Sequence, residues 1–108
     1  MQTVNIKPLS VNDAWQGRRF KTPKYKQYEQ DLRLLLRPYS IPEGELKLMM
    51  QIGFSNRASD IDNPLKPFVD VLQKKYEFND NRIYELHIKK IIVPRGDEFL
   101  NWGFEPCQ

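Results

Sequence analysis

The chain has 108 residues, of which 40% are hydrophobic and 29% charged, and a net charge of +3. This composition excludes disordered and fibrous classes. No apolar run approaches the roughly 20 residues that span a bilayer, and the N-terminus lacks the apolar stretch of a signal peptide. The single cysteine, Cys107, allows no internal disulfide, as is usual in reducing compartments. We therefore expect one cytoplasmic domain over residues 1–108, small enough to make oligomerisation a reasonable expectation.

Positive charge is concentrated near the N-terminus. Residues 1–38 carry eight Lys or Arg against three Asp or Glu, whereas the remainder carries nine against eleven. This asymmetry indicates a polyanionic partner whose binding site also needs carboxylates nearby. A solvated basic face without a partner is the alternative interpretation.

The first half of the chain predicts one strand and one helix. Residues 3–9 alternate apolar and polar side chains, which is typical of a short strand. Residues 10–23 have no clean period and form a long polar loop, a feature that is often functional in small domains. Residues 24–37 place apolar side chains at three-and-four spacing, which predicts a helix capped by Thr22, with Pro23 at its first position.

The second half predicts a longer strand, a helix and two more strands. Residues 46–54 alternate most clearly and indicate a central strand, and residues 64–76 carry the apolar stripe of a helix. Strands follow over residues 82–94 and 99–104, joined by a hairpin at Gly96. The order is β-α-β-α-β-β, which predicts an α+β fold: a small mixed or antiparallel sheet with two helices on one face.

Two aspartates stand immediately before the second helix. Asn63 is expected to cap that helix and Pro64 to occupy its first position. Asp60 and Asp62 then lie on an extended segment, where period two places both side chains on the same side, about 6 to 7 Å apart. Two carboxylates in this arrangement can bind a hard cation.

A third carboxylate and a lysine extend this candidate site. Asp80 follows the helix, which is about 20 Å long, so Asp80 meets the pair only if its segment folds back. An all-oxygen ligand set suits Mg²⁺, or Mn²⁺, better than zinc. Lys66 lies in the first helical turn, where a cation opposes the macrodipole, and this placement favours a role toward the same phosphate.

Structural explanations exist for each of these residues. Aspartates before a helix commonly cap it and complement its dipole, and Asp80 between two asparagines is also typical of a turn. Asp70 lies away from the apolar stripe of the helix and is expected to be solvated.

The combination D-x-D-N-x-x-K, a helix and then N-D-x-x-I resembles the RusA family of Holliday-junction resolvases, small proteins common in phages and prophages. Asp60, Asp62, Asn63 and Lys66 match the signature position by position. Asp80, three residues before Ile83, matches the third catalytic aspartate, although Asn81 is an alternative match. The resemblance covers nearly the whole chain. Ser59 stands where the family often has a basic residue, a charge that Arg57 can supply.

The resemblance implies a RusA-like fold and a specific chemistry. Such proteins are homodimers that bind four-way DNA junctions and introduce paired, symmetry-related nicks in DNA recombination and repair. By resemblance, Asp60, Asp62 and Asp80 hold Mg²⁺ and activate water, and Lys66 contacts the scissile phosphate. Backbone phosphates are expected to bind basic residues of the N-terminal loop and of the segment before the aspartates: Arg18, Arg19, Lys21, Lys24 and Arg57.

Three hypotheses follow. The first is a metal-dependent, structure-specific endodeoxyribonuclease acting on branched DNA. The second is a catalytically inactive DNA-binding module on the same scaffold, whose carboxylates only cap the helix. The third is a small interaction protein whose basic loop contacts another protein, for which no salt-dependent affinity for DNA is expected.

Overall fold

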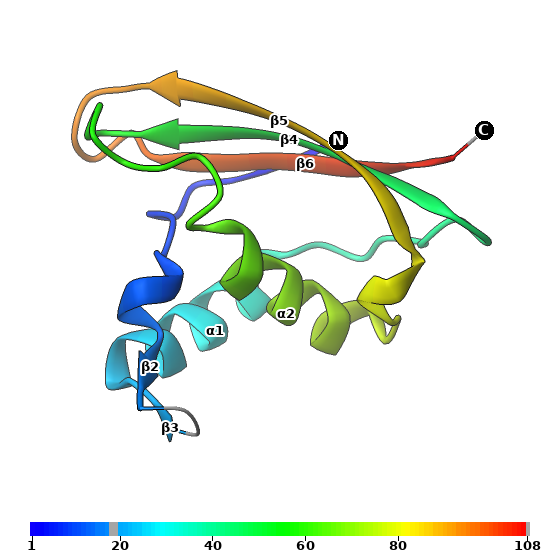
Figure 1. Ribbon diagram of the computed structural model, residues 1–108, viewed down its shortest axis with the longest axis horizontal. Helices are drawn as coiled ribbons and strands as arrows, with labels where there is room; N and C mark the ends of the chain where they lie inside the picture. The colour runs from blue at the N-terminus through cyan, green and yellow to red at the C-terminus, as the bar shows by residue number, and fades with distance from the viewer. Residues whose placement is uncertain (18–19, 108) are drawn as a thin grey trace.

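The structure is a computed structural model that describes residues 1–17 and 20–107. A mixed sheet lies over two helices, which cover one of its faces (Figure 1). This arrangement confirms the predicted α+β class with the helices on one face. The elements in chain order are β1 (Gln2–Val4), the 3₁₀ turn η1 (Val11–Asp13), β2 (Trp15–Gln16), β3 (Phe20–Lys21), α1 (Pro23–Leu35), β4 (Leu46–Phe54), α2 (Leu65–Tyr76), the 3₁₀ turn η2 (Asp80–Arg82), β5 (Ile83–Ile92) and β6 (Phe99–Pro106).

The main sheet has the strand order β1-β6-β4-β5. β4 pairs in parallel with β5 and antiparallel with β6, so β5 and β6 lie on opposite sides of it. The predicted hairpin at Gly96 is therefore wrong, although this glycine does turn the chain with a positive φ of 97°. The buried strand β4 takes a partner along both edges, and β6 must cross it rather than fold back onto β5.

The two small strands within the predicted polar loop pair with each other. β2 and β3 form a separate antiparallel ribbon, with Trp15 opposite Lys21. Just after the ribbon, the Thr22 side chain accepts a hydrogen bond from the backbone N–H of Tyr25 at 3.1 Å, and Pro23 begins α1. The predicted start of this helix is confirmed.

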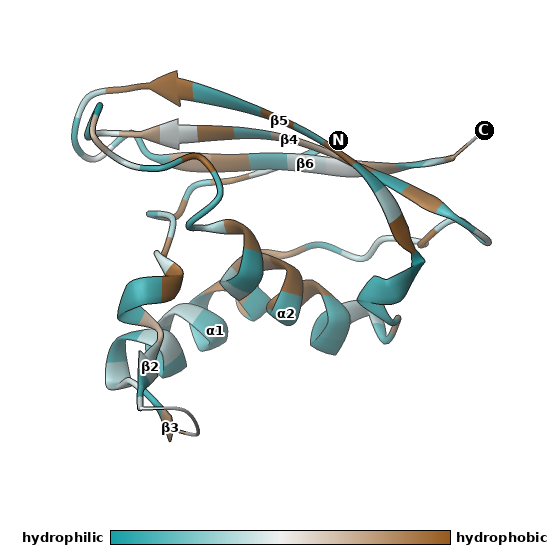
Figure 2. Ribbon diagram, viewed as in Figure 1, coloured by the Kyte–Doolittle hydropathy of each residue, from teal (hydrophilic) through white to brown (hydrophobic). Residues whose placement is uncertain are grey.

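The core lies between the sheet and the helices. Alternate side chains of β4 point toward the helices and are buried, among them Leu48, Met50 and Ile52. From α2, Phe68 packs edge-on against Trp102 of β6, with ring centroids 6.0 Å apart. Figure 2 shows teal along the helix surfaces that turn away from the sheet. No helix in the described part of the chain is long and apolar enough to cross a membrane.

A partly buried carboxylate ties the helices together. Glu29 of α1 accepts a hydrogen bond from Lys21 at 2.8 Å and one from Lys74 of α2 at 2.6 Å. Burial acts to raise the pKa of Glu29, but the two lysine hydrogen bonds outweigh it and hold the pKa below its ordinary value. The position of α2, which carries the candidate site, therefore depends in part on this carboxylate.

We expect Glu29→Gln to lower the free energy of unfolding by about 1 kcal/mol at pH 7, because both ion pairs lose their anion. A lowered folded-state pKa stabilises the protein above the unfolded pKa, and this contribution disappears as pH falls through the folded value. The difference between wild type and variant in urea unfolding should thus shrink as pH falls below the ordinary glutamate pKa of about 4.3 and on through the lower folded value. Glu43→Gln, at an exposed position, is the matched control and should change little. A pH-independent difference would contradict the assignment.

Candidate active site

The segment that carries the two aspartates is a turn. The backbone N–H of Asn63 donates to the carbonyl of Asp60 at 3.3 Å, and that of Leu65 donates to the carbonyl of Asp62 at 3.1 Å. The predicted extended geometry, with both carboxylates on one side, is therefore wrong. The predicted cap is also wrong, because α2 begins after Pro64 without a side-chain capping hydrogen bond. The carbonyl oxygen of Asp62 accepts the backbone N–H of Leu65, in place of the side-chain oxygen that Asn63 was expected to offer as a cap.

Asp62 and Asp80 line the same groove, between α2 and the start of β5. The groove has a volume of about 410 Å³, and Lys66 lies along it as well. Its remaining lining is largely apolar and comprises Leu65, Val69, Ile83, Tyr84 and Leu86. Asn81, the alternative match, is exposed and does not line the groove. Three of the four predicted catalytic residues thus share one cleft, which we call the Asp62–Asp80 groove.

Asp60 lies elsewhere. It lines a larger groove of about 1030 Å³ on the other side of the turn, together with Lys24 and Arg57. Among the residues that the structure describes, no three His, Cys, Asp or Glu side chains are grouped closely enough to hold a metal ion. The structure therefore brings together two of the three predicted metal ligands and leaves the third on the adjoining surface.

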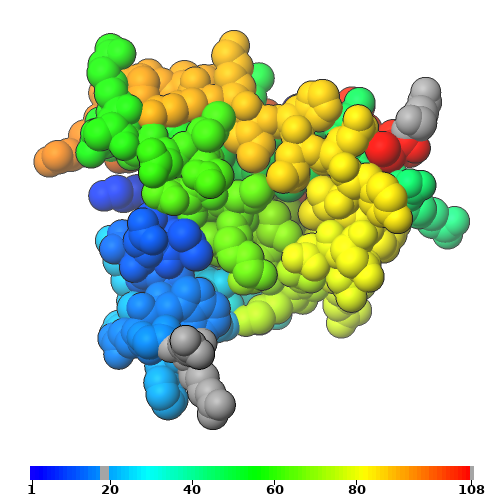
Figure 3. All heavy atoms as spheres, in the orientation of Figure 1, coloured from blue at the N-terminus to red at the C-terminus, as the bar shows by residue number. Residues whose placement is uncertain are grey.

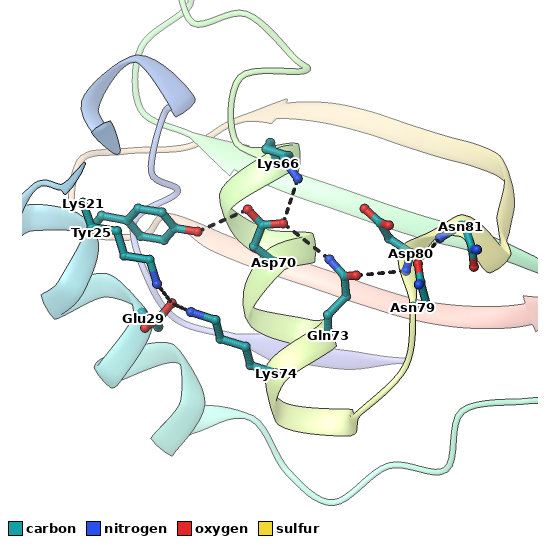
Figure 4. A network of polar contacts seen from close by, with 10 residues as sticks. All are labelled: Lys21, Tyr25, Glu29, Lys66, Asp70, Gln73, Lys74, Asn79, Asp80 and Asn81. Atoms are coloured by element: carbon teal, nitrogen blue, oxygen red, sulfur yellow. Dashed lines mark hydrogen bonds and ion pairs between the residues drawn. The ribbon is translucent and has the colours of Figure 1, made fainter. Parts of the chain in front are cut away.

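A hydrogen-bonded chain along α2 links Lys66 to Asp80 (Figure 4). Lys66 Nζ donates to Asp70 Oδ1 at 3.0 Å, and Gln73 Nε2 donates to the same oxygen at 3.4 Å. Gln73 Oε1 in turn accepts the backbone N–H of Asp80 at 3.0 Å. The hydrogen bond to Asp70 raises the pKa of Lys66, and the charge of Asp80 adds to this effect. Lys66 is thus kept as a cation.

Asp70 is not the solvated residue that the sequence suggested. Its side chain is only 19% exposed, and its second oxygen accepts a hydrogen bond from the hydroxyl of Tyr25 at 3.4 Å. Burial, followed by the charge of Asp70, raises the pKa of Tyr25 well above its ordinary value. The spacing of Lys66, Asp70 and Gln73, four and three residues apart on one helix face, was the signal available in the sequence.

A second residue that the sequence analysis missed holds the loop before Asp60. Lys90 Nζ donates to the carbonyl of Arg57 at 2.8 Å and also to the carbonyl of Ser59. The ammonium group lies 5.5 Å from the centre of the Phe54 ring. Lys90 of β5 therefore holds the loop that leads to both exposed aspartates.

The predicted DNA-binding residues have different surroundings. Lys21 is paired with Glu29 and lies 5.1 Å from the centre of the Tyr25 ring, so its charge is engaged within the protein. Lys24 lies 3.6 Å from Asp13 in an exposed pair. Arg57 is exposed beside Asp60 in the larger groove. Arg18 and Arg19 lie outside the described residues.

The oxygen donors of the Asp62–Asp80 groove fit a magnesium ion. Within the described residues, the carboxylates of Asp62 and Asp80 accept no hydrogen bond and form no ion pair, so their oxygens are available as ligands. Mg²⁺ is commonly bound by one or two carboxylates, with water and phosphate oxygens completing its shell. The chemistry of the donor set therefore matches a hard divalent cation, with substrate oxygens as the remaining ligands.

We expect Gln73→Met to release the backbone of Asp80. Methionine is of similar length but accepts no comparable hydrogen bond, so the amide hydrogen of Asp80 should exchange about tenfold faster, measured by NMR. The amide of Asn81 is the internal control, because it donates to the Asn79 side chain at 2.9 Å and should keep its rate. An unchanged rate at Asp80 would show that Gln73 does not hold this turn.

Comparison with known families now adds to this geometry. The sequence profile of the family described as Endodeoxyribonuclease RusA matches residues 7–96 of the chain. Among curated protein sequences, none matches closely enough to count as a relative. The matched range contains every described candidate residue and all of the lining of the two grooves except Ile6 and Glu98. The family is one of endodeoxyribonucleases that resolve Holliday junctions. The chain belongs to the RusA family.

Proposed function

We propose that the protein is a Mg²⁺-dependent, structure-specific endodeoxyribonuclease that resolves four-way DNA junctions by paired symmetric nicks in recombination and repair. The observation that carries this proposal is the Asp62–Asp80 groove, which is lined by two free carboxylates and a lysine from the two ends of α2. Hydrolysis of a phosphodiester needs a cation beside the phosphate and an activated water. The two carboxylates of this groove are suited to bind a metal ion and to orient a water, and the lysine is suited to bind the phosphate.

Asp62 and Asp80 are the proposed principal ligands of the metal ion. Asp60 is proposed as the third, since it lies two residues before Asp62 across a single turn. When bound, Mg²⁺, or Mn²⁺ in its place, lowers the pKa of a coordinated water and neutralises charge on the phosphodiester. The free carboxylates orient the attacking water.

Lys66 is proposed to bind the scissile phosphate and to stabilise the negative charge that develops on its oxygens. Its hydrogen bond to Asp70 keeps it protonated and limits its rotation, which places a fixed positive charge in the groove. Asp70 and Gln73 act through Lys66 and Asp80, so they are positioning residues.

Recognition of the junction is proposed to depend on phosphate contacts and on shape. Lys24 and Arg57 are exposed next to Asp60 and suit backbone phosphates. Arg18, Arg19 and Lys21 are proposed to add to this basic surface, with Lys21 contributing its charge from within the Glu29 pair. Binding should weaken as salt increases, because phosphate contacts release counterions.

A homodimer is proposed as the active form. A two-fold dimer presents the same site twice, which suits the paired nicks on a junction with two-fold symmetry. The face of the sheet that carries Lys47, Gln51 and His87 is not covered by a helix of the described chain, so a second copy has access to it.

An inactive DNA-binding module on the same scaffold is the second candidate. The placement of Asp60 outside the Asp62–Asp80 groove is the observation that favours it, since only two carboxylates then remain beside Lys66. The two candidates differ in whether the carboxylates are needed for cleavage while binding is retained.

We expect Asp62→Asn and Asp80→Asn each to reduce Mg²⁺-dependent cleavage of a synthetic four-way junction by about 100-fold or more, because each removes a proposed metal ligand. Asp60→Asn should reduce cleavage to a similar extent, because Asp60 is the proposed third ligand of the metal ion. Junction affinity in EDTA should stay within about threefold of wild type, since no phosphate-binding cation is lost.

Asp97→Asn is the matched control: it removes an exposed aspartate outside both grooves and should leave cleavage unchanged. The inactive module predicts no Mg²⁺-dependent nicking by the wild type. Full cleavage by Asp62→Asn and Asp80→Asn would contradict the proposed site.

A further inference from the structure

The larger groove is not used by the chemistry proposed above, except at its edge. It is bounded by the N-terminal segment, α1, the loop after β4 and the turn after β5, and has a volume of about 1030 Å³. In Figure 3 the N-terminal segment (blue) and the loop before α2 (green) adjoin on one side of the molecule. Asp60 and Asn63 line the groove, so it reaches the turn that also carries Asp62.

Acids and bases line this groove in equal number, so its formal charge is balanced, but the two kinds of side chain differ in their hydrogen bonds. Three of its acids are engaged by the protein: Asp13 pairs with Lys24, Asp31 accepts from Gln27 at 2.8 Å, and Glu98 accepts from Ser55 at 2.7 Å and from the Gly96 amide.

Three of its cations, in contrast, donate to no described side chain or backbone group: Lys7, Arg57 and Arg95. An anion entering the groove therefore finds three cations whose N–H donors have no partner among the described residues.

Tyr28 of α1 lines the groove and carries a hydroxyl that is enclosed by the protein. Its side chain is buried, with 6% exposed, and its hydroxyl has no partner among the described residues. Burial raises its pKa, so the group remains a protonated hydroxyl. A buried hydroxyl without a partner destabilises the free protein, and a ligand that supplies one recovers the lost free energy on binding.

The remaining lining combines neutral polar groups with apolar ones. Gln27, Asn56, Ser59 and Asn63 offer amide and hydroxyl groups, and Leu9, Phe54 and Ile92 offer apolar contacts. Nucleobases present this same combination of polar edges and apolar faces, and grooves that bind single strands pair such contacts with cations along the backbone. The volume is at the upper end of the range for ligand pockets, roughly 300–1,000 Å³, which suits a few nucleotides.

We propose that this groove binds an unpaired segment of DNA strand at the branch point of the junction and leads it to the turn that carries Asp60 and Asp62. The phosphates contact Lys7, Arg57 and Arg95, and a base contacts the wall at Tyr28. The inference rests on the proposed function for the source of the strand. The larger groove then binds the unpaired strand, whereas the Asp62–Asp80 groove carries out the cleavage.

The test is an NMR titration of the ¹⁵N-labelled full chain with a single-stranded hexanucleotide in EDTA. The expected result is amide shifts at residues 6–13, 55–60 and 95, with none at Lys47 or His87 on the open sheet face. Arg95→Ala should weaken binding of the oligonucleotide about fivefold or more. Lys89→Ala, which removes one exposed cation from the open sheet face, is the matched control and should weaken it by less than about twofold.

Tyr28→Phe supplies the second readout. The variant should bind the hexanucleotide at least about threefold more weakly, while its melting temperature stays the same or rises, because no hydrogen bond is lost in the free protein. A merely structural role for Tyr28 predicts unchanged binding.

Shifts that map to the open sheet face, or equal losses for Arg95→Ala and Lys89→Ala, would overturn the inference. A junction assay in Mg²⁺ separates the two proposals. Cleavage by wild type without shifts in the groove contradicts the strand-binding role alone, whereas shifts in the groove without cleavage contradict the nuclease proposal alone.

Discussion

The parallel pairing of β4 with β5 is the constraint on which the candidate site depends. Parallel neighbours cannot be joined by a tight turn, so the chain between Phe54 and Ile83 must cross from one end of the sheet to the other, and α2 makes that crossing. β5 then runs back along α2. Asp62 precedes the helix and Asp80 follows it, yet both face the groove between helix and strand.

The helix α2 therefore has two tasks, which different faces of it perform. Phe68 and Leu72 are buried against the sheet, and this packing fixes the distance between helix and strand. Asp70 and Gln73, on the polar side, connect Lys66 to the backbone of Asp80. When most hydrogen-bonding groups of a partly buried polar network have partners, the side chains of that network are held in one geometry. Phosphate chemistry requires such fixed positions of the groups that contact the phosphate.

The parts of the fold that depend on local pattern could be predicted from the sequence. The alternation in β4, the stripe of α2 and the Thr22–Pro23 start of α1 needed only neighbouring residues. The partner of β6 could not be predicted, because a strand's neighbour is decided by non-local packing, and a local turn at Gly96 suggested a hairpin instead. The turn conformation of the Asp60–Asp62 segment could not be predicted for a related reason. Pro64 is buried by non-local packing, and the turns before it supply the hydrogen bonds that a helix cap would make. Asp70 was misjudged because its partner Tyr25 comes from α1, a non-local contact that the pattern of α2 does not show.

The central claim is that Asp62 and Asp80 jointly bind a divalent cation next to a DNA phosphate. The most direct measurement is the anomalous diffraction of Mn²⁺ in a crystal of the protein with a non-cleavable four-way junction. The account predicts a manganese peak in the groove between α2 and β5, bonded to both carboxylates and to one phosphate oxygen. A peak bonded to Asp60 without either of the other two, or a DNA complex in which the groove holds no metal at saturating Mn²⁺, would contradict it.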